Sequence, residues 1–114
     1  MADAMSQMRK GTTTLAVLKL LDDVGEPIHG YEIIQRLEER SKGIFEFKEG
    51  LIYPTLHRME QEGLLESTWV GEPGTRRRKV YRVTAEGHRR LEEELQQWKD
   101  FRRGMGLLLR LEST

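Results

Sequence analysis

The sequence of 114 residues contains no cysteine, which excludes a disulfide framework, a thiolate metal site and a cysteine nucleophile. Its longest strongly apolar stretch, residues 15–21, is interrupted by Lys19 and is far too short to span a bilayer. The first ten residues lack the basic start, apolar run and small-residue cleavage site of a signal peptide. We therefore expect a soluble protein of the cytoplasm with no membrane partner.

The sequence also lacks a net charge, because 19 basic residues balance 19 acidic ones. A nucleic-acid-binding domain is usually basic overall, so the total does not indicate one. The charges are nevertheless segregated along the chain. Five basic residues and no acidic residue lie between Gly74 and Thr84, namely Arg76, Arg77, Arg78, Lys79 and Arg82. Because a phosphate responds to the surface that it touches, this local concentration matters more than the sum.

No pattern of catalytic or metal-binding residues is present. His29, His57 and His88 lie on three different predicted elements and show none of the short spacings typical of metal ligands. A glycine-rich phosphate loop, a nucleophile elbow and an acid–base pair are also absent. We expect no metal, no cofactor and no enzymatic activity.

Three segments have the apolar spacing of amphipathic helices. We predict helices that begin near residues 12–14, 29–31 and 48, and that end near residues 24, 41 and 62. Hydroxyl groups of Thr12–Thr14 should cap the first helix, and Gly63 should end the third in a left-handed conformation. The expected buried stripes are Leu15, Leu18 and Leu21, then Tyr31, Ile34 and Leu37, then Ile52, Leu56 and Met59.

A hairpin and a long helix should follow. Residues 65–70 and 79–84 are rich in β-branched and aromatic residues and flank a turn segment at 71–74. Trp69 should cover this hairpin, whose tip should be mobile. Thr84 is the expected N-cap of the last helix. Apolar residues recur along that helix near the 3.5-residue repeat of a helix–helix seam: Leu91, Leu95, Trp98, Phe101, Met105 and Leu108.

The predicted fold is α+β and mainly α. It is a winged helix-turn-helix, in which the hairpin is the wing, with a long C-terminal dimerisation helix. We expect a flexible N-terminal arm over residues 1–10, a DNA-binding domain over residues 11–84 and the dimerisation helix over residues 85–114.

Three stretches resemble the PadR family of bacterial transcription regulators, specifically its short members. They are residues 29–33 (HGYEI), 50–60 (GLIYPTLHRME) and 77–84 (RRKVYRVT), in this order. The resemblance runs from about Lys10 to about Phe101. It implies that the third helix enters the major groove, that the wing lies along the neighbouring backbone and that the last helix forms a dimer. Leu51 departs from the family, which usually has Thr or Ser there, so the resemblance implies no DNA contact from its side chain.

The candidate DNA-binding residues lie on the third helix, on the wing and at the start of the second helix. Basic side chains can reach guanine edges or phosphates, and hydroxyl groups commonly bind phosphate oxygens. The third helix is expected to expose Lys48, Glu49, Tyr53, Thr55 and Arg58. The wing offers a phosphate clamp of Arg76, Arg77, Arg78 and Lys79. The alternative for both groups is an ordinary solvated surface.

His29 and Tyr31 begin the second helix, where free backbone N–H groups can meet a phosphate. The alternative for Tyr31 is a core ring with its hydroxyl group in water. Trp98 also has two interpretations. It is either a hydrophobic anchor of the dimer seam or, as in some short PadR-like regulators, a residue that binds flat aromatic effectors.

These expectations combine into a sequence-specific, double-stranded-DNA-binding regulator of transcription. We expect a repressor that acts as a homodimer on a pseudo-palindromic operator and that is released by a small aromatic effector. The alternative function is a winged-helix module for protein–protein contact without DNA binding, in which the basic wing holds an acidic partner.

Overall fold

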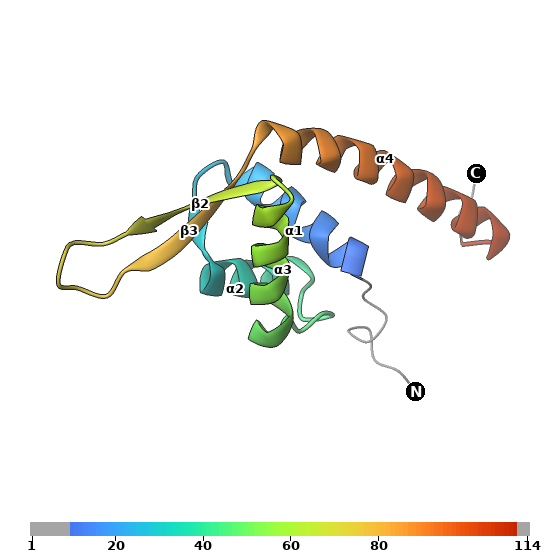
Figure 1. The fold of residues 1–114 in the computed structure, drawn as a ribbon. Helices are drawn as coiled ribbons and strands as arrows, with labels where there is room; N and C mark the ends of the chain where they lie inside the picture. Colours follow the sequence, from blue (N-terminus) through green and yellow to red (C-terminus); the bar gives the residue numbers. More distant parts are fainter. Residues whose placement is uncertain (1–9, 112–114) are drawn as a thin grey trace.

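A computed structural model describes residues 10–111, with the side chain of Lys10 excepted (Figure 1). The predicted winged arrangement of helices and a hairpin, mainly helical, is confirmed. Residues 1–9 of the flexible arm predicted for residues 1–10, and residues 112–114 of the predicted dimerisation segment, lie outside the described residues, whereas Lys10 belongs to the first helix. The elements are α1 (Lys10–Val24), β1 (Ile28–His29), α2 (Gly30–Arg40), α3 (Glu49–Gln61), β2 (Leu65–Val70), β3 (Arg78–Val83) and α4 (Ala85–Leu108).

A single hydrophobic core lies between α1, α2, α3 and the inner end of the sheet. The predicted stripes of α1 and α3 enter it, except that Leu15 is only partly buried. Phe47, which precedes α3, and Leu64, which follows it, complete the core around this helix. The large side chains that are fully buried in the core are Val17, Leu18, Leu20, Ile33, Ile52, Leu56, Met59, Leu64 and Leu65.

The start of α1 differs from the prediction. The helix begins at Lys10, and Thr13 and Thr14 lie inside it with exposed fractions of 0% and 5%. The expectation that these threonines cap the helix is therefore wrong. A threonine can be buried within a helix because its hydroxyl group can bond to neighbouring polar groups, and Thr14 Oγ1 accepts a hydrogen bond from Arg58 of α3.

The turn between α2 and α3 is held by hydrogen bonds from α2. Ser41 Oγ accepts a hydrogen bond from the Phe45 N–H, and Glu38 Oε1 accepts one from the Phe47 N–H. Lys42 and Gly43 adopt positive φ angles of 53° and 79°, which reverse the chain after α2. These contacts set the angle at which α3 leaves the turn.

The third helix contains Pro54 in its second turn. A proline has no N–H group, so the Gly50 carbonyl lacks its regular helical donor at this position. At the other end, Gly63 takes a φ of 79° and the Leu64 N–H donates to the Met59 carbonyl, as predicted for a left-handed stop.

The sheet has three antiparallel strands in the order β1-β3-β2. The hairpin pairs Leu65 with Val83 and Val70 with Arg78. The sequence analysis missed β1, which has two residues and pairs Ile28 with Tyr81. Trp69 does not cover the hairpin, because 62% of it is exposed, and that expectation is wrong.

A tight junction joins α3, the wing and α4. Thr84 caps α4 as predicted, since its Oγ1 accepts a hydrogen bond from the Gly87 N–H at 3.0 Å and donates one to the Gly63 carbonyl at 2.6 Å. A Cβ atom on Gly87 would lie 2.1 Å from the Leu64 carbonyl oxygen. Only glycine therefore permits this approach of α4 to the end of α3.

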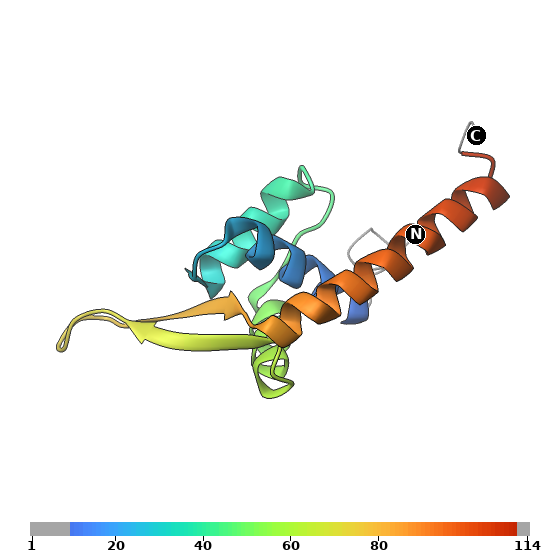
Figure 2. The same cartoon turned by 90° about the horizontal axis from the view of Figure 1, so that it is seen from above.

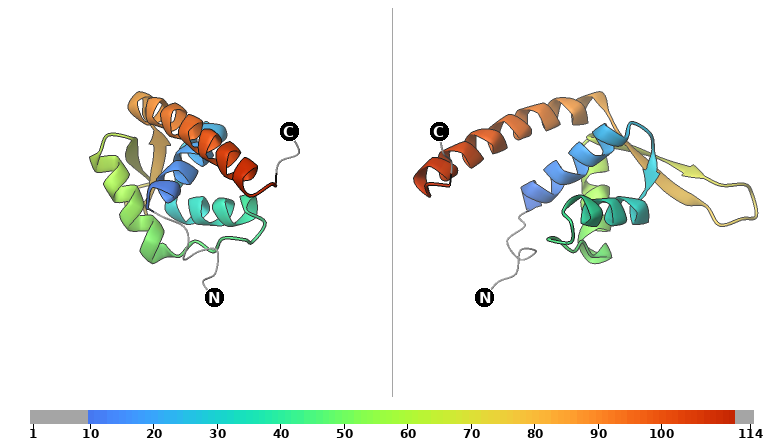
Figure 3. Two further views of the ribbon diagram at one scale, coloured as in Figure 1. Left: turned by 90° about the vertical axis from the view of Figure 1, so that its right-hand side faces the viewer. Right: turned by 180° about the vertical axis from the view of Figure 1, so that it is seen from behind.

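The described chain is elongated, with extents of 58 × 33 × 21 Å. The wing and the distal half of α4 project from opposite sides of the three-helix body (Figure 2). Two further views show that α4 passes over α1 and then continues beyond it (Figure 3). The molecule thus has two extended arms attached to one core.

His88 connects α4 to α1. Its Nδ1 lies 3.0 Å from Asp22 Oδ1 of α1, and its Nε2 lies 3.0 Å from Glu92 Oε1 of α4. The hydrogen bond to Asp22 raises the pKa of His88 above its ordinary value of 6.5, and Glu92 adds to the effect. Carboxylates at both ring nitrogens favour the protonated imidazolium.

Because folding raises this pKa, the stabilisation from His88 is present below its ordinary value and is lost as the pH rises through the folded-state value. We expect the melting temperature of the wild type to fall, relative to that of a His88→Gln variant, as the pH rises above the ordinary histidine pKa of 6.5. Circular-dichroism melts in one buffer of constant ionic strength would measure this difference. A difference that stays constant as the pH rises would contradict the prediction.

Candidate nucleic-acid interface

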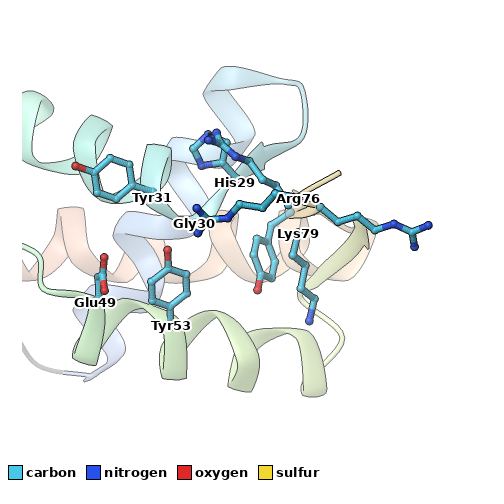
Figure 4. Close-up of a pocket in the computed structure, with 10 residues that line it drawn as sticks. His29, Gly30, Tyr31, Glu49, Tyr53, Arg76 and Lys79 are labelled. Carbon is cyan, nitrogen blue, oxygen red and sulfur yellow. Dashed lines mark hydrogen bonds between the residues drawn. The ribbon is translucent and has the colours of Figure 1, made fainter. Parts of the chain in front are cut away.

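A groove of about 400 Å³ opens between the start of α2, one side of α3 and the wing (Figure 4). The structure brings together here most of the residues that the sequence predicted for DNA binding. The groove is lined by His29, Gly30, Tyr31, Glu49, Tyr53, Arg76, Arg77, Arg78, Lys79 and Tyr81.

The ring of Tyr53 closes the gap between α3 and the start of α2. A Cβ atom at Gly30 would lie 2.5 Å from Tyr53 Cε1, so the glycine makes room for the ring. Tyr53 is 41% exposed, and its hydroxyl group points into the space between the two helices (Figure 4). Tyr31 is 53% exposed at the edge of the groove, so the expectation that it is buried in the core is wrong.

His29 caps α2 and faces the wing. Its Nδ1 accepts a hydrogen bond from the Glu32 N–H at 3.2 Å, so the proton of a neutral ring is on Nε2. Nε2 lies 3.0 Å from Arg78 Nη1. The Nε2–H and the guanidinium are both donors, and an oxygen that accepts from both would satisfy them together. The two residues thus form a pair of donors at one end of the groove.

Lys79 connects the wing to α3 instead of pointing freely into solvent. Its Nζ lies 3.2 Å from Glu60 Oε1 and 5.6 Å from the centre of the Tyr81 ring. Ser67 Oγ donates a hydrogen bond to the same carboxylate, and this bond, followed by the contact with Lys79, lowers the pKa of Glu60. The charge of Lys79 is therefore balanced within the chain. Burial raises the pKa of the Tyr81 hydroxyl group.

Four cations near the groove have no carboxylate partner among residues 10–111, and one of them, Arg78, lies against His29 instead. Arg76 and Arg77 in the wing, and Lys48 at the N-cap of α3, are exposed and form no ion pair with residues 10–111. Among the described residues that line the groove, Glu49 alone carries a carboxylate. Around the groove, the positive charge available to a ligand therefore lies at the wing and at the start of α3.

Two residues predicted for the exposed face of α3 lie elsewhere. Thr55 is only 6% exposed, and its Oγ1 donates to the Leu51 carbonyl at 2.7 Å, which satisfies the hydroxyl group inside the core. Arg58 turns toward α1, and its Nη2 donates to Thr14 Oγ1 of that helix at 2.8 Å. Its Nε lies 3.8 Å from Oε2 of Glu62, the C-cap of α3 itself. The expectation that α3 exposes Thr55 is wrong, whereas the side chain of Arg58 is partly exposed, at 25%.

The exposed face of α3 carries other residues that the sequence analysis missed. Besides Tyr53, which was predicted, it contains Gly50, Pro54, His57 and Gln61. At 100° per residue, these positions lie opposite the buried stripe of Ile52, Leu56 and Met59. Helical periodicity alone would have identified them. The predicted set favoured charged residues instead, and Arg58 lies at the border of this face.

The apolar stripe of α4 changes its surroundings along the helix. Leu91 is 3% exposed and belongs to the core of its own chain, so its assignment to a dimer seam is wrong. Leu95 and Met105 are half-buried. Trp98, Phe101 and Leu108 are 42%, 59% and 78% exposed.

The exposed rings of α4 border a second cavity. Trp98 and Phe101 are stacked with their centres 5.9 Å apart and an angle of 26° between their planes. Together with Gly11, Thr12 and Leu15 of α1, and with Glu94 and Gln97, they line an open cavity of about 430 Å³.

The described residues form neither a metal-binding cluster nor a membrane-spanning helix. No group of three or more His, Asp or Glu residues within 10–111 is arranged to hold a metal ion. Among the described helices, none combines the length and the apolarity that crossing a membrane requires.

Comparison with known proteins identifies relatives over most of the chain. Residues 17–93 match the transcriptional regulator PadR-like family. A transcriptional regulator of Mycobacterium tuberculosis is 33% identical over 90 residues, which are 79% of this chain and 78% of that protein. A PadR family transcriptional regulator from Eggerthella lenta has a similar structure, with a TM-score of 0.77, 35% identity and coverage of 95% of this chain and 88% of that one. A PadR-like transcriptional regulator from Bacillus cereus has a TM-score of 0.75 and 33% identity, with coverage of 90% of this chain and 96% of that one.

Proposed function

Because the chain belongs to the PadR-like family of transcriptional regulators, we propose that it regulates transcription by binding double-stranded DNA in a sequence-specific manner. The observation that carries this proposal is the pair of exposed arginines, Arg76 and Arg77, which have no ion pair within residues 10–111 and line the groove beside α3. Arginine is the side chain best suited to phosphate recognition, and unpaired cations beside an exposed helix favour a polyanionic ligand.

In this proposal α3 enters the major groove and the wing follows the adjacent backbone. Arg76 and Arg77 contact phosphates. A further phosphate oxygen accepts hydrogen bonds from His29 Nε2–H, at the N-cap of α2, and from Arg78, at the start of β3. The Nε2 of His29 and the Nη1 of Arg78 lie 3.0 Å apart. Lys48 places a positive charge at the start of α3. The net charge of zero does not oppose this arrangement, because a phosphate responds to the cations of the surface that it touches and not to the sum over the chain.

Glu49 and Tyr53 have different roles in the proposed complex. A phosphate would repel the carboxylate of Glu49, so this side chain suits a base edge, where it can accept a hydrogen bond from the amino group of cytosine. The hydroxyl groups of Tyr53 and Tyr31 are exposed at the groove and suit phosphate oxygens. Lys79 serves mainly to hold the wing against α3 through Glu60.

Removal of the free wing charges tests the proposal. We expect an Arg76→Ala/Arg77→Ala double variant to bind all duplexes more weakly, because two phosphate contacts are lost. The slope of log affinity against log salt should become shallower by about 0.9 for each contact. Fluorescence anisotropy with a labelled duplex, at several salt concentrations, measures both effects.

The matched control is Lys99→Ala/Arg103→Ala, which removes two exposed charges from α4, away from the groove. This control should keep the affinity and the slope of the wild type. Equal effects of the two double variants would count against the wing as the contact surface. If the wild type binds no duplex even at low salt, the alternative of a module that holds an acidic protein is favoured.

We also propose that the protein acts as a homodimer that pairs through the distal half of α4. Trp98, Phe101 and Leu108 form an exposed apolar surface on a helix segment that projects from the body (Figure 1). Such a surface indicates a partner, and a projecting helix is marginal in water without one. A twofold dimer would present two α3 helices to successive major grooves, with half-site centres roughly 34–36 Å apart or a multiple of that distance.

Charged substitutions in this surface test the dimer. We expect a Trp98→Glu/Phe101→Glu variant to dissociate, with a dimer dissociation constant raised roughly 30-fold or more, as for loss of an interface hot spot. Sedimentation velocity over a range of protein concentrations measures the change, and the Lys99→Ala/Arg103→Ala variant again serves as control. A fully dimeric double glutamate variant would refute this seam.

A repressor of this kind would act by occupying promoter DNA, and we propose that a flat aromatic effector releases it. The support is the cavity of about 430 Å³ at Trp98 and Phe101, which lies within the usual size range of small-molecule sites, roughly 300–1,000 Å³. Glu94 at its edge suits a cationic ligand.

The two tryptophans of the chain allow a clean test of the effector. A planar cationic dye such as proflavine should quench the fluorescence of Trp69→Phe protein, which retains Trp98. It should leave the fluorescence of Trp98→Phe protein unchanged, because Trp69 lies on the wing. Titration in the absence of DNA measures both responses, and equal quenching of the two variants would argue against this cavity as the binding site.

A further inference from the structure

A small cavity of about 230 Å³ lies where α1, α3 and α4 meet, and none of its lining residues borders the groove beside the wing. Each of the three helices or its cap contributes two residues to the wall: Gly11 and Thr14, Arg58 and Glu62, Arg90 and Glu94. The cavity is several times larger than the share of one water molecule, roughly 30 Å³, and smaller than the usual sites of drug-sized ligands, roughly 300–1,000 Å³. Its size suits a molecule of a few non-hydrogen atoms.

Arg58 carries a hydrogen-bond donor that the fold leaves unused. Its Nε atom is buried and has no acceptor among residues 10–111. The carboxylate of Glu62, with which it forms an ion pair, is 3.8 Å away and beyond the reach of a hydrogen bond. The Nη2 of the same guanidinium is occupied by Thr14. A buried donor without an acceptor costs free energy, so an acceptor atom supplied from the cavity would stabilise this side chain.

The ion pair of α4 that borders the cavity is open in a similar way. Arg90 Nη1 lies 3.6 Å from Glu94 Oε1, which is also too far for a hydrogen bond. The neighbouring pair of the same spacing, Arg89 and Glu93, closes to 2.9 Å on the exposed side of the helix. A four-residue spacing on this helix thus permits a direct bond. At the cavity, a guanidinium and a carboxylate instead keep hydrogen-bonding capacity for a third group.

We propose that this cavity binds a small zwitterion that has a carboxylate and an ammonium group, as a free α-amino acid does. The carboxylate accepts hydrogen bonds from Arg58 Nε and from Arg90, and the ammonium group donates to Glu62 and Glu94. A simple anion would face two carboxylates without a partner for them, and a simple cation would face two guanidinium groups. Because the charges of the four side chains sum to zero, a ligand with one charge of each sign matches them.

This site is separate from the two that the proposed function uses. Its occupation requires neither DNA nor the aromatic effector. Glu94 borders both this cavity and the one at Trp98, whereas Glu62 and Arg90 border this one alone. Substitutions of Glu62 and Arg90 therefore distinguish the two cavities. Arg58 is left unchanged in the test, because its contact with Thr14 also serves the fold.

The experiment uses the full chain without DNA, in one buffer at neutral pH. Each of the common L-amino acids is added separately at about 10 mM, a concentration at which a ligand with a dissociation constant of about 1 mM stabilises the fold measurably. Acetate and methylammonium, at the same concentration, present each charge alone. Differential scanning calorimetry gives the melting temperatures, and isothermal titration calorimetry gives the dissociation constant of each amino acid that raises them.

We expect at least one amino acid to raise the melting temperature by roughly 5 °C, whereas acetate and methylammonium leave it nearly unchanged. Arg90→Met and Glu62→Gln should each weaken the binding of that amino acid roughly tenfold, as for loss of a hydrogen bond between charged groups. The matched control is Arg89→Met, which removes the arginine of the neighbouring ion pair on the same helix and should bind as the wild type does. Melts without ligand show that each variant is folded.

Absence of binding by every amino acid would overturn the inference, because water would then fill the cavity and supply the acceptor for Arg58. Wild-type affinity in both the Arg90→Met and the Glu62→Gln proteins, or an equal loss in Arg89→Met, would place the ligand elsewhere on the chain. A response to acetate as large as that to the amino acid would reject the zwitterion in favour of a simple anion. Since DNA is absent from these measurements, failure of the proposed function would not alter their outcome.

Discussion

The contact between Gly87 and the Leu64 carbonyl oxygen sets the arrangement of the three parts on which the proposed function depends. A Cβ atom on residue 87 would lie 2.1 Å from that oxygen, so the start of α4 rests directly on the end of α3. Thr84 strengthens the junction, because its N–H donates to the same carbonyl and its hydroxyl group donates to that of Gly63. Both strands of the wing also begin or end here. The directions of α3, the wing and α4 are therefore coupled at one point.

This junction places unlike surfaces side by side. The exposed face of α3 is polar or apolar but carries little charge, whereas the wing carries free arginines beyond the point where Lys79 is bound to Glu60. Charge at the wing acts over roughly a Debye length of about 8–10 Å and is insensitive to sequence, whereas uncharged groups act only at contact. A chain with a net charge of zero can thus attract a polyanion locally and still discriminate between sequences by short-range contacts.

Periodicity predicted the helices and the hairpin because burial of one face determines these elements. It could not show which neighbour covers a given face. Leu91 and Trp98 belong to one apolar stripe, yet Leu91 packs in its own core and Trp98 is exposed, since α4 leaves the body between them. Arg58 lies at the border of its face, where a long side chain can reach Thr14 of another helix. The pairing of β1 involves two residues, too few to produce a pattern in the sequence.

The gradual exposure of α4 has a consequence for a dimer built on it. Along the apolar stripe of α4, the part beyond Leu95 is the part available to a second copy, because Leu91 is occupied by the core of its own chain. The partner would then contact α4 at a distance from the junction, and the helix would act as a rigid lever between that contact and α3. A rotation of the helix at Trp98 and Phe101 would be carried to Gly87, where no space exists to absorb it. Changes at the proposed dimer contact would therefore alter the spacing of the two α3 helices, and with it the fit to paired half-sites on DNA.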